Sequence, residues 1–243
     1  MASLAKKLYR RLFSGKRAAL ASLGEADRVL VEAIRRQKLT YLPERKLASI
    51  ANTCREVEAR GLDGGFYETG CALGGSTILI ASIKSPARPL SVYDVFGMIP
   101  APGQQDGDDV HKRYDKIASG GARGIDGDDY YGYEDDLLTK VKQNLRLFEI
   151  DESDNVTLIE GLVQNTLSVT GEVAFAHIDV DWYEPVMVSL ERLVPNLVVG
   201  GSIILDDYHD WSGCRKATDE YFAGRASDFC FDESAGSLKI TRV

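Results

Sequence analysis

The chain has few cysteines and no long apolar run. Its four cysteines, Cys54, Cys71, Cys214 and Cys230, lie far apart among 243 residues and match no zinc-binding spacing. They are also too few for a disulfide-stapled fold, so we expect reduced thiols. No apolar stretch approaches the roughly 20 residues that span a bilayer, and the first residues lack the apolar core of a signal peptide. These absences predict a cytoplasmic protein.

Positive charge is also in short supply. Lys and Arg total 29 against 37 Asp and Glu, which leaves a net charge of −8. A surface that neutralises nucleic-acid phosphates needs clustered Lys and Arg over an extended face, so we expect no nucleic-acid partner. With 44% hydrophobic and 27% charged residues, the chain is long enough to bury one large core.

The first 17 residues, MASLAKKLYRRLFSGKR, depart from this acidic balance because they contain six basic residues and no acid. Their apolar residues recur at helical spacing, which predicts a basic amphipathic helix. Such a helix can contact an anionic membrane surface. The alternative, which we favour, is docking on its own domain or on a second subunit, and we expect a homo-oligomer.

The pattern of apolar residues changes along the chain. It is helical from 24 to 60, and later stretches predict helices over 76–85, 133–148, 183–197 and 213–225. Short, apolar, β-branched stretches predict strands at 64–70, 89–96, 155–161, 173–180 and 201–207. Strands that alternate with helices imply crossover connections and a parallel sheet covered on both faces.

The C-terminal end predicts an antiparallel hairpin from 227–234 and 237–243, joined by an Ala-Gly turn. Five parallel strands followed by such a hairpin resemble the Rossmann-like sheet of class I methyltransferases. We therefore expect an α/β domain over 61–243, preceded by a helical extension over 1–60. The long connection over 97–132 does not fit the sheet, and its length favours a lid over the site.

A glycine-rich turn follows the first predicted strand in YETGCALGGST, residues 67–77. Such a turn lets a ligand approach the backbone at the carboxyl end of a parallel strand, although a simple tight turn is the alternative. Asp94 closes the next strand, where a carboxylate can accept both ribose hydroxyls. Together these features predict S-adenosylmethionine. The residues expected to contact this cofactor are Glu68, Gly70, Ser76, Asp94, Gly161, Leu162 and Gln164.

Two carboxylate pairs follow the fourth and fifth predicted strands, in AHIDVDWYEP and GSIILDDYHDW. Asp179, Asp181, Asp206 and Asp207 should meet at one sheet edge, where like charges raise each other's pKa. A divalent cation removes this repulsion, and carboxylate oxygens suit Mg²⁺. Three Asp suffice for the metal, so the fourth can serve as general base, with His209 as a competitor. Helix caps and solvated strand ends are the alternative interpretation.

These motifs resemble the TylF-type macrocin O-methyltransferase family, over residues 38 to 225. The resemblance rests on HIDVDWYEP, on VPNLVVGGSIILDDYHDWSGCRKATDEYF and on TYLPERKLASIANTCREVEARGLDGGFYETGCALGGST. It implies a bacterial enzyme that methylates a sugar hydroxyl with S-adenosylmethionine and Mg²⁺. It also implies Asp181 as the base, and Asp179, Asp206 and Asp207 as metal ligands.

The resemblance further places Glu68, Gly70, Asp94 and Asp179 at the cofactor, with a flap at Thr40, Tyr41 and Leu42 over it. Two features depart from the family pattern. Val180 stands where the family usually has Gly, and the 97–132 segment differs from that of the antibiotic-sugar enzymes. With PLSVYDVFGMIP, these departures favour a polysaccharide sugar as acceptor.

The acceptor itself is predicted to pack against aromatic rings. Tyr130, Tyr131 and Trp182 offer apolar faces for a pyranose, and His209 lies near them in the sequence. A catechol-type O-methyltransferase is an alternative, because it shares the metal geometry. A binding module that has lost catalysis is another, although four intact aspartates argue against it.

Overall fold

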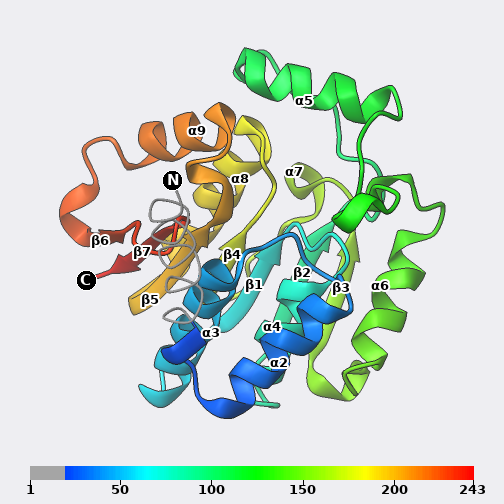
Figure 1. Ribbon diagram of the computed structural model, residues 1–243. Coiled ribbons are helices and arrows are strands. Elements are labelled where there is room, and N and C mark those ends of the chain that lie inside the picture. Colours follow the sequence, from blue (N-terminus) through cyan, green and yellow to red (C-terminus); the bar gives the residue numbers. More distant parts are fainter. Residues whose placement is uncertain (1–19) are drawn as a thin grey trace, which may run out of the picture.

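The structure, a computed structural model, describes residues 20–243, so the predicted basic helix over 1–17 lies outside the described residues. Seven strands form one sheet in the order β3-β2-β1-β4-β5-β7-β6 (Figure 1). Strands β1 to β5 are parallel, and β7 runs antiparallel to both β5 and β6. This confirms the predicted sheet and its closing hairpin. The strands are β1 (Gly65–Thr69), β2 (Leu90–Asp94), β3 (Val156–Glu160), β4 (Val173–Ile178), β5 (Leu197–Leu205), β6 (Phe229–Asp232) and β7 (Leu238–Arg242).

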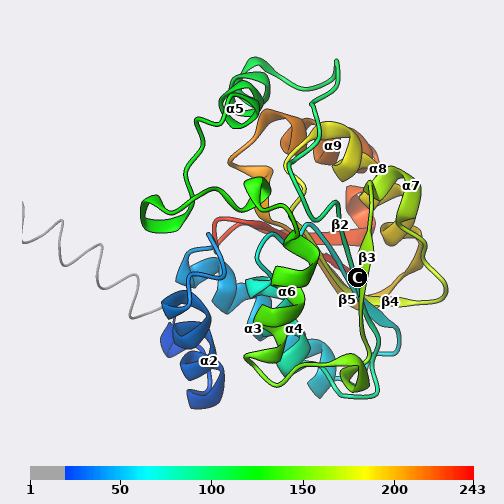
Figure 2. The same cartoon turned by 90° about the vertical axis from the view of Figure 1, so that its right-hand side faces the viewer.

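Helices cover both faces of the sheet, and each layer has its own hydrophobic cluster (Figure 2). One face carries α2 (Glu25–Arg36), α3 (Glu44–Ala59), α4 (Gly75–Ile83) and α6 (Leu137–Arg146). The other carries α7 (Val163–Thr166), α8 (Tyr183–Leu193) and α9 (Ser212–Phe222). Strands β1 and β4 are buried along their whole length, as expected for strands that are covered on both sides.

The helices that precede the sheet share its core. Leu47 and Ile50 of α3 are fully buried in the same cluster as Phe66 of β1 and Phe175 of β4. The rings of Phe66 and Phe175 pack edge to face, with centroids 5.3 Å apart. The described part of the predicted extension is therefore packed onto the sheet, which brings α3 close to the carboxyl ends of the strands.

Strand β5 begins and ends earlier than the sequence predicts. It starts at Leu197 rather than 201, because a short 3₁₀ turn (Val194–Asn196) delivers the buried Leu197 directly into the sheet. It ends at Leu205, and a second 3₁₀ turn (Asp206–Tyr208) follows. The carboxylate pair Asp206 and Asp207 therefore lies in a turn beyond the strand end, where both side chains can face the same way.

The 97–132 segment is folded. It contains α5 (Asp108–Ala118) and 3₁₀ turns at Ile125–Gly127 and Tyr131–Tyr133, and it lies beyond one end of the sheet (Figure 1). Ile117, Ala122 and Tyr130 form a small cluster of its own. The hydroxyl of Tyr133 donates to the carbonyl of Ile117 at 2.6 Å and accepts from the backbone N–H of Ala122 at 3.2 Å. This segment is called the insert below.

Two aspartates of the insert cap helices of the main domain. Helices α8 and α9 begin after Trp182 and Trp211, whose indole rings offer no acceptor for the free N–H groups of the first turn. Asp106 Oδ1 accepts from the backbone N–H of Tyr183 at 2.8 Å, and Asp109 Oδ2 accepts from that of Ser212 at 2.9 Å. The insert thus supplies the caps of both helices that follow the carboxylate pairs.

Other features bear on the environment of the protein. No helix within residues 20–243 is both long and apolar enough to cross a bilayer. The cysteines are free thiols, of which Cys54, Cys71 and Cys214 are buried and Cys230 is exposed.

We predict that Asp106→Ala loosens the insert. It removes a helix cap, which costs about 1 kcal/mol, and it breaks a tether between the insert and α8. Unfolding in urea should show the loss of stability, and hydrogen exchange over 97–132 should become faster. Asp115→Ala, which removes an exposed carboxylate from α5, is the control and should change neither. Unchanged exchange in Asp106→Ala would show that the cap does not hold the insert.

Candidate functional site

A cavity of about 550 Å³ lies at the carboxyl ends of the parallel strands and is closed on one side by the insert. Its volume is in the usual range for small-molecule sites. The cavity brings together nearly all the residues predicted from the sequence. Those that line it are Tyr41, Leu42, Gly70, Ser76, Asp94, Tyr130, Tyr131, Gly161, Leu162, Gln164, Asp179, Asp181, Trp182, Asp206 and Asp207.

The loop after β4 aims two carboxylates at this cavity. The backbone N–H of Asp179 donates to the carbonyl of Thr69 at 2.8 Å, which continues the pairing with β1 by one residue. Asp181 then adopts a left-handed conformation with φ of 59°, and the N–H of Trp182 donates back to the carbonyl of Val180 at 2.6 Å. Asp tolerates this conformation better than most residues. The tight turn ends the strand at this point, and Asp179 and Asp181 both line the cavity.

Three carboxylates form a candidate cation site. Asp179, Asp206 and Asp207 each offer one oxygen, and these oxygens lie within 4.8 Å of one another. Asp206 Oδ1 and Asp207 Oδ2 are buried without a hydrogen-bond partner. Buried polar atoms are nearly always paired, so two free oxygens on adjacent residues require an explanation. A hard divalent cation fits this donor set, because it binds carboxylate oxygens.

The electrostatics of the cluster support the same conclusion. Burial and the charges of neighbouring aspartates raise the pKa of Asp179 and of Asp181 well above the ordinary value. Burial and the charge of Asp206 raise the pKa of Asp207 to about 6. Each shift reflects the cost of keeping negative charges together away from water, and a bound cation would reverse it.

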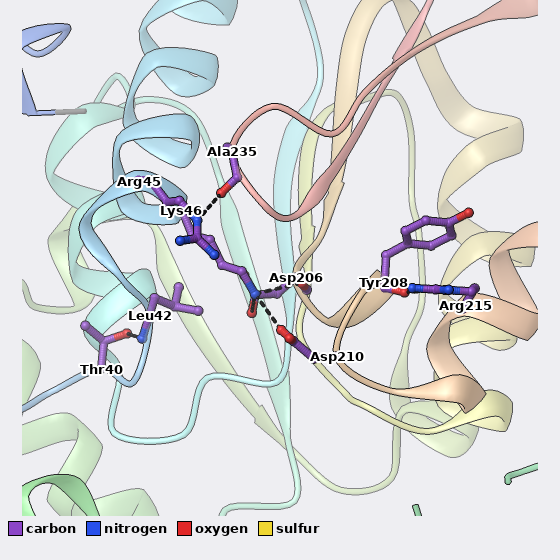
Figure 3. Close-up of polar contacts among 9 residues, drawn as sticks. All are labelled: Thr40, Leu42, Arg45, Lys46, Asp206, Tyr208, Asp210, Arg215 and Ala235. Carbon is purple, nitrogen blue, oxygen red and sulfur yellow. Dashed lines mark hydrogen bonds and ion pairs between the residues drawn. The ribbon is translucent and has the colours of Figure 1, made fainter. Parts of the chain in front are cut away.

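Lys46 of α3 partly offsets this charge (Figure 3). Its ammonium donates to Asp206 Oδ2 at 2.9 Å and to Asp210 Oδ2 at 2.8 Å, and the side chain is 5% exposed. Burial lowers the pKa of Lys46, but the charge of Asp206 and these hydrogen bonds outweigh it, so the pKa rises above 10.5. Lys46 engages one oxygen of Asp206 and leaves the other free for a cation.

Asp94 organises the other end of the cavity. Its Oδ2 accepts from the backbone N–H groups of Cys71 and Ala72 at 2.7 and 3.2 Å, and its Oδ1 accepts from that of Phe96 at 2.7 Å. A carboxylate has about four acceptor positions, so one remains. Asp94 can therefore bind one ribose hydroxyl in this arrangement. To bind both ribose hydroxyls, as the sequence predicts, Asp94 would have to lose one of its three hydrogen bonds to the backbone.

The glycine after β1 holds the two ends of the site together. Gly70 has φ of 83°, and a Cβ at this position would collide with the carbonyl oxygen of Asp179. Only glycine allows the strand ends of β1 and β4 to approach this closely. The cofactor end and the carboxylate cluster are therefore neighbours along the same edge of the sheet.

The predicted flap meets the insert through aromatic rings. Thr40 Oγ1 accepts from the N–H of Leu42 at 3.1 Å, and the Tyr41 ring lies 5.9 Å from that of Tyr131. The Tyr130 and Tyr131 centroids are 4.5 Å apart. Burial raises the pKa of Tyr130 to about 12, so this phenol stays protonated and can donate a hydrogen bond into the cavity.

Trp182 links the carboxylate loop to the insert. Its Nε1 donates to the carbonyl of Pro100 at 2.9 Å, and its ring packs edge to face against Trp211, with centroids 5.9 Å apart. Both rings line the cavity. They provide an apolar wall next to Asp181, which is the kind of surface against which a ring-shaped acceptor packs.

Sequence comparison assigns the chain to a family. The model of the family described as macrocin O-methyltransferase (TylF) matches residues 10–228. The chain belongs to this family. It is therefore an O-methyltransferase.

Two curated relatives are each 28% identical to this O-methyltransferase. One is the 8-demethyl-8-(2,3-dimethoxy-alpha-L-rhamnosyl)-tetracenomycin-C 4'-O-methyltransferase of Streptomyces olivaceus, aligned over 75% of this chain and 67% of that one. The other is the demethyldecarbamoylnovobiocin O-methyltransferase of Streptomyces niveus, over 76% and 68%. The solved O-methyltransferase NovP shares the fold, with a TM-score of 0.69, 24% identity and coverage of 84% and 82%.

Two predicted site residues lie outside the cavity of the O-methyltransferase. The first is Glu68, which was expected at the cofactor. It is fully buried within β1, where it accepts a hydrogen bond from the hydroxyl of Thr77 and lies 3.0 Å from Nδ1 of His177. Because Glu68 lies one residue before the end of β1, its side chain enters the layer between the sheet and α4. Glu68 therefore contacts Thr77 in the first turn of α4 and does not line the cavity.

The second is His209, which was expected near the acceptor as a competing base. The 3₁₀ turn over Asp206–Tyr208 directs the two aspartates inward and carries the chain outward at His209. The imidazole Nε2 lies 3.2 Å from Glu233 Oε2, and the residue borders a separate groove on the surface. His209 is therefore removed from the candidates for the base.

Among the lining residues that the sequence did not point to are Lys46, Arg113 and Trp211. A signal for Lys46 was present, because positions 46, 50, 54 and 57 form the buried stripe of α3, and a lysine there needs a partner. Arg113 and Trp211 carry no comparable signal. Their places depend on how the insert packs over α9.

We predict that Asp207 makes the stability of the metal-free O-methyltransferase depend on pH. A carboxyl whose pKa rises from 3.8 to about 6 on folding stabilises the fold at low pH, and this contribution is lost as pH rises through about 6. Compared with Asp207→Asn, the metal-free protein should lose on the order of 2 kcal/mol between about pH 4 and pH 7. Urea unfolding measures this difference, and parallel curves for the two proteins would contradict the raised pKa.

Proposed function

We propose that this O-methyltransferase uses S-adenosylmethionine and Mg²⁺ to methylate a hydroxyl of a sugar. The observation that carries the proposal is the cluster of Asp179, Asp206 and Asp207, with two free buried oxygens, in the same cavity as the Gly70 turn. An O-methyltransferase needs a methyl donor and a way to activate a weakly acidic hydroxyl. The two ends of this cavity have the chemistry for these two tasks.

The donor end would hold S-adenosylmethionine, which supplies an electrophilic methyl group on a sulfonium. Asp94 offers its remaining acceptor position to the ribose, and Gly161, with φ of 138°, follows β3 where a purine can pack beside Leu162. Ser76 stands in the first turn of α4, near the N–H groups that attract a carboxylate. Each contact uses a residue that lines the cavity.

The metal end would hold Mg²⁺ through the three clustered aspartates. The ion would lower the pKa of an acceptor hydroxyl and orient it. Lys46 keeps one oxygen of Asp206 in place by its hydrogen bond, so the free oxygen has a defined direction. The chain therefore supplies a ligand set that is held in place before the ion arrives.

Asp181 is the proposed general base. It lies outside the group of three ligands, yet it lines the same cavity, so its carboxylate stays available when the other three hold the ion. A carboxylate placed beside the acceptor hydroxyl can take its proton in the transition state. The proton of the acceptor hydroxyl would move to Asp181 as the oxygen attacks the methyl group.

A sugar is the acceptor class favoured by the aromatic walls and by the relatives. Trp182, Trp211 and Tyr130 line the cavity beside the carboxylates, and a pyranose packs well against such rings. One relative acts, by its name, on a rhamnosyl derivative of tetracenomycin C. We keep the predictions of a polysaccharide sugar, a cytoplasmic location and a homo-oligomer as proposals.

We predict that EDTA abolishes methyl transfer and that Mg²⁺ restores it. Asp206→Asn should lower activity by about 100-fold or more, because it alters a metal ligand. Asp210→Asn is a matched control, since Asp210 also pairs with Lys46 but lies outside the ligand set. It should keep its metal dependence. Full activity of the wild type after exhaustive chelation would remove the metal from the proposal.

We predict that Asp181→Asn lowers kcat on the sugar acceptor by roughly 10²- to 10⁴-fold, because the variant keeps the shape of the side chain and loses the base. Calorimetry should show that the affinity for S-adenosylmethionine barely changes. A sugar hydroxyl is far less acidic than a catechol and needs a base even beside a metal. Near-normal kcat for Asp181→Asn on the true acceptor would point to an acidic phenol instead.

A further inference from the structure

Two positive charges line the cavity in the part of the chain that the structure describes. They are Lys46 and Arg113. Lys46 is already paired, because its ammonium donates hydrogen bonds to Asp206 and Asp210. Arg113 comes from α5 of the insert and also lines the cavity. The two cations therefore differ in what they are free to do.

The guanidinium of Arg113 lies over the ring of Tyr130. Its Cζ lies 5.7 Å from the centroid of Tyr130. Burial raises the pKa of Tyr130, Tyr41 and Asp181, and the charge of Arg113 opposes each of these shifts. The charge of Arg113 therefore acts on Tyr41 of the flap, Tyr130 of the insert and Asp181 of the carboxylate loop, all of which line the cavity.

No carboxylate within residues 20–243 lies at ion-pair or hydrogen-bonding distance from Arg113, although the insert is rich in acids. Several of those acids have other partners. Asp106 and Asp109 cap α8 and α9, and Asp128 pairs with Lys38 at 2.9 Å. The nearby Arg123 lies 3.6 Å from Asp129. Among the described residues, Arg113 alone combines a place in the cavity wall with a guanidinium that makes no ion pair.

Within residues 20–243 the N–H groups of Arg113 make no ion pair, so they remain available to a ligand. The N–H edge of a guanidinium matches the two oxygens of a carboxylate or phosphate group. An acceptor with such a group would meet repulsion from the aspartates at the strand ends unless a cation held its charge at a distance from them. Arg113 is placed in the insert, while the aspartates are in the loops after β4 and β5.

We propose that Arg113 binds an anionic group on the acceptor, so that the substrate of this enzyme is an acidic sugar. The group is a carboxylate, as in a uronic acid, or a phosphate, as in a sugar phosphate or a nucleotide sugar. This inference rests on the proposed sugar O-methylation and names the class of sugar. Because the anion and the hydroxyl to be methylated contact different walls of the cavity, Arg113 also selects which hydroxyl reaches Asp181.

The test compares matched acceptors that differ in one charged group. Methyl hexopyranosides are paired with the corresponding hexuronic acids, and hexoses with the corresponding hexose 1-phosphates and uridine diphosphate hexoses. Methyl transfer is measured for each with S-adenosylmethionine and Mg²⁺. In parallel, calorimetry measures binding of the same sugars in the presence of S-adenosylhomocysteine, which requires no turnover.

The variants are Arg113→Gln, Arg113→Lys and, as a matched control, Lys112→Gln. Lys112 is the exposed neighbour on α5 and is absent from the cavity wall, so its loss changes the charge of the helix but not the site. Arg113→Gln should lower kcat/KM and affinity for the preferred anionic sugar by about 10- to 100-fold, the usual effect of losing a charged hydrogen bond. Arg113→Lys should retain part of the preference, and Lys112→Gln all of it.

Two further measurements distinguish anion binding by Arg113 from other roles of this residue. They are kcat/KM on neutral sugars and the affinity for S-adenosylmethionine. On a neutral sugar, Arg113→Gln should change kcat/KM by less than about threefold, as for a substitution that touches no contact. An equal loss on neutral and anionic sugars would assign Arg113 to the shape of the site and overturn the proposal. A weaker affinity for S-adenosylmethionine would overturn it as well, because the anion would then be that of the methyl donor.

The same comparisons show whether the anionic group is a carboxylate or a phosphate. They also test the anion site separately from the proposed sugar methylation. A preference for hexuronic acids identifies a carboxylate, and one for the phosphorylated sugars identifies a phosphate. If no sugar is methylated but an anionic sugar binds in an Arg113-dependent way, the proposed sugar methylation fails and the anion site stands. If the wild type binds and methylates every neutral sugar as well as its charged counterpart, the anion site fails alone.

Discussion

The mutual repulsion of four aspartates at one edge of the sheet is the constraint on which the rest of the site depends. Asp179, Asp181, Asp206 and Asp207 share a cavity, and the raised pKa of three of them records the cost of holding their charges together. Lys46 neutralises only part of this charge, and it leaves buried oxygens of Asp206 and Asp207 free. The repulsion between these carboxylates lowers the stability of the metal-free protein. Binding of a cation would relieve this repulsion and so stabilise the fold.

The insert is coupled to this site by its own charged residues. Asp106 and Asp109 cap α8 and α9, and these helices begin directly after the loops that carry the four aspartates. Trp182 adds a hydrogen bond to Pro100, so the carboxylate loop and the insert are held at a third point. A movement of the insert would therefore disturb the helix starts that fix the carboxylates. In the reverse direction, an acceptor that contacts both would hold the insert closed.

Positive and negative charges are separated within the cavity. Negative charge gathers at the ends of β4 and β5, and the unpaired guanidinium of Arg113 lies in the insert. Such a separation orients a substrate that carries one anionic group and one hydroxyl group, because each end of the substrate has a single favourable place.

The sequence indicated neither α5 nor α7, but by itself it determined the parallel strands, the closing hairpin, the glycine-rich turn after β1 and the two carboxylate pairs that follow β4 and β5. These features depend on local periodicity and on strand ends, which neighbouring residues specify. Only the tertiary structure decided that Glu68 is buried against Thr77 and His177, that His209 turns outward, and that Lys46 and Arg113 reach the cavity. Which face of β1 is covered by α4, and where the chain turns after Asp207, depend on packing, and contacts between α3 or α5 and the strand ends join residues far apart in the chain. No local pattern encodes these contacts.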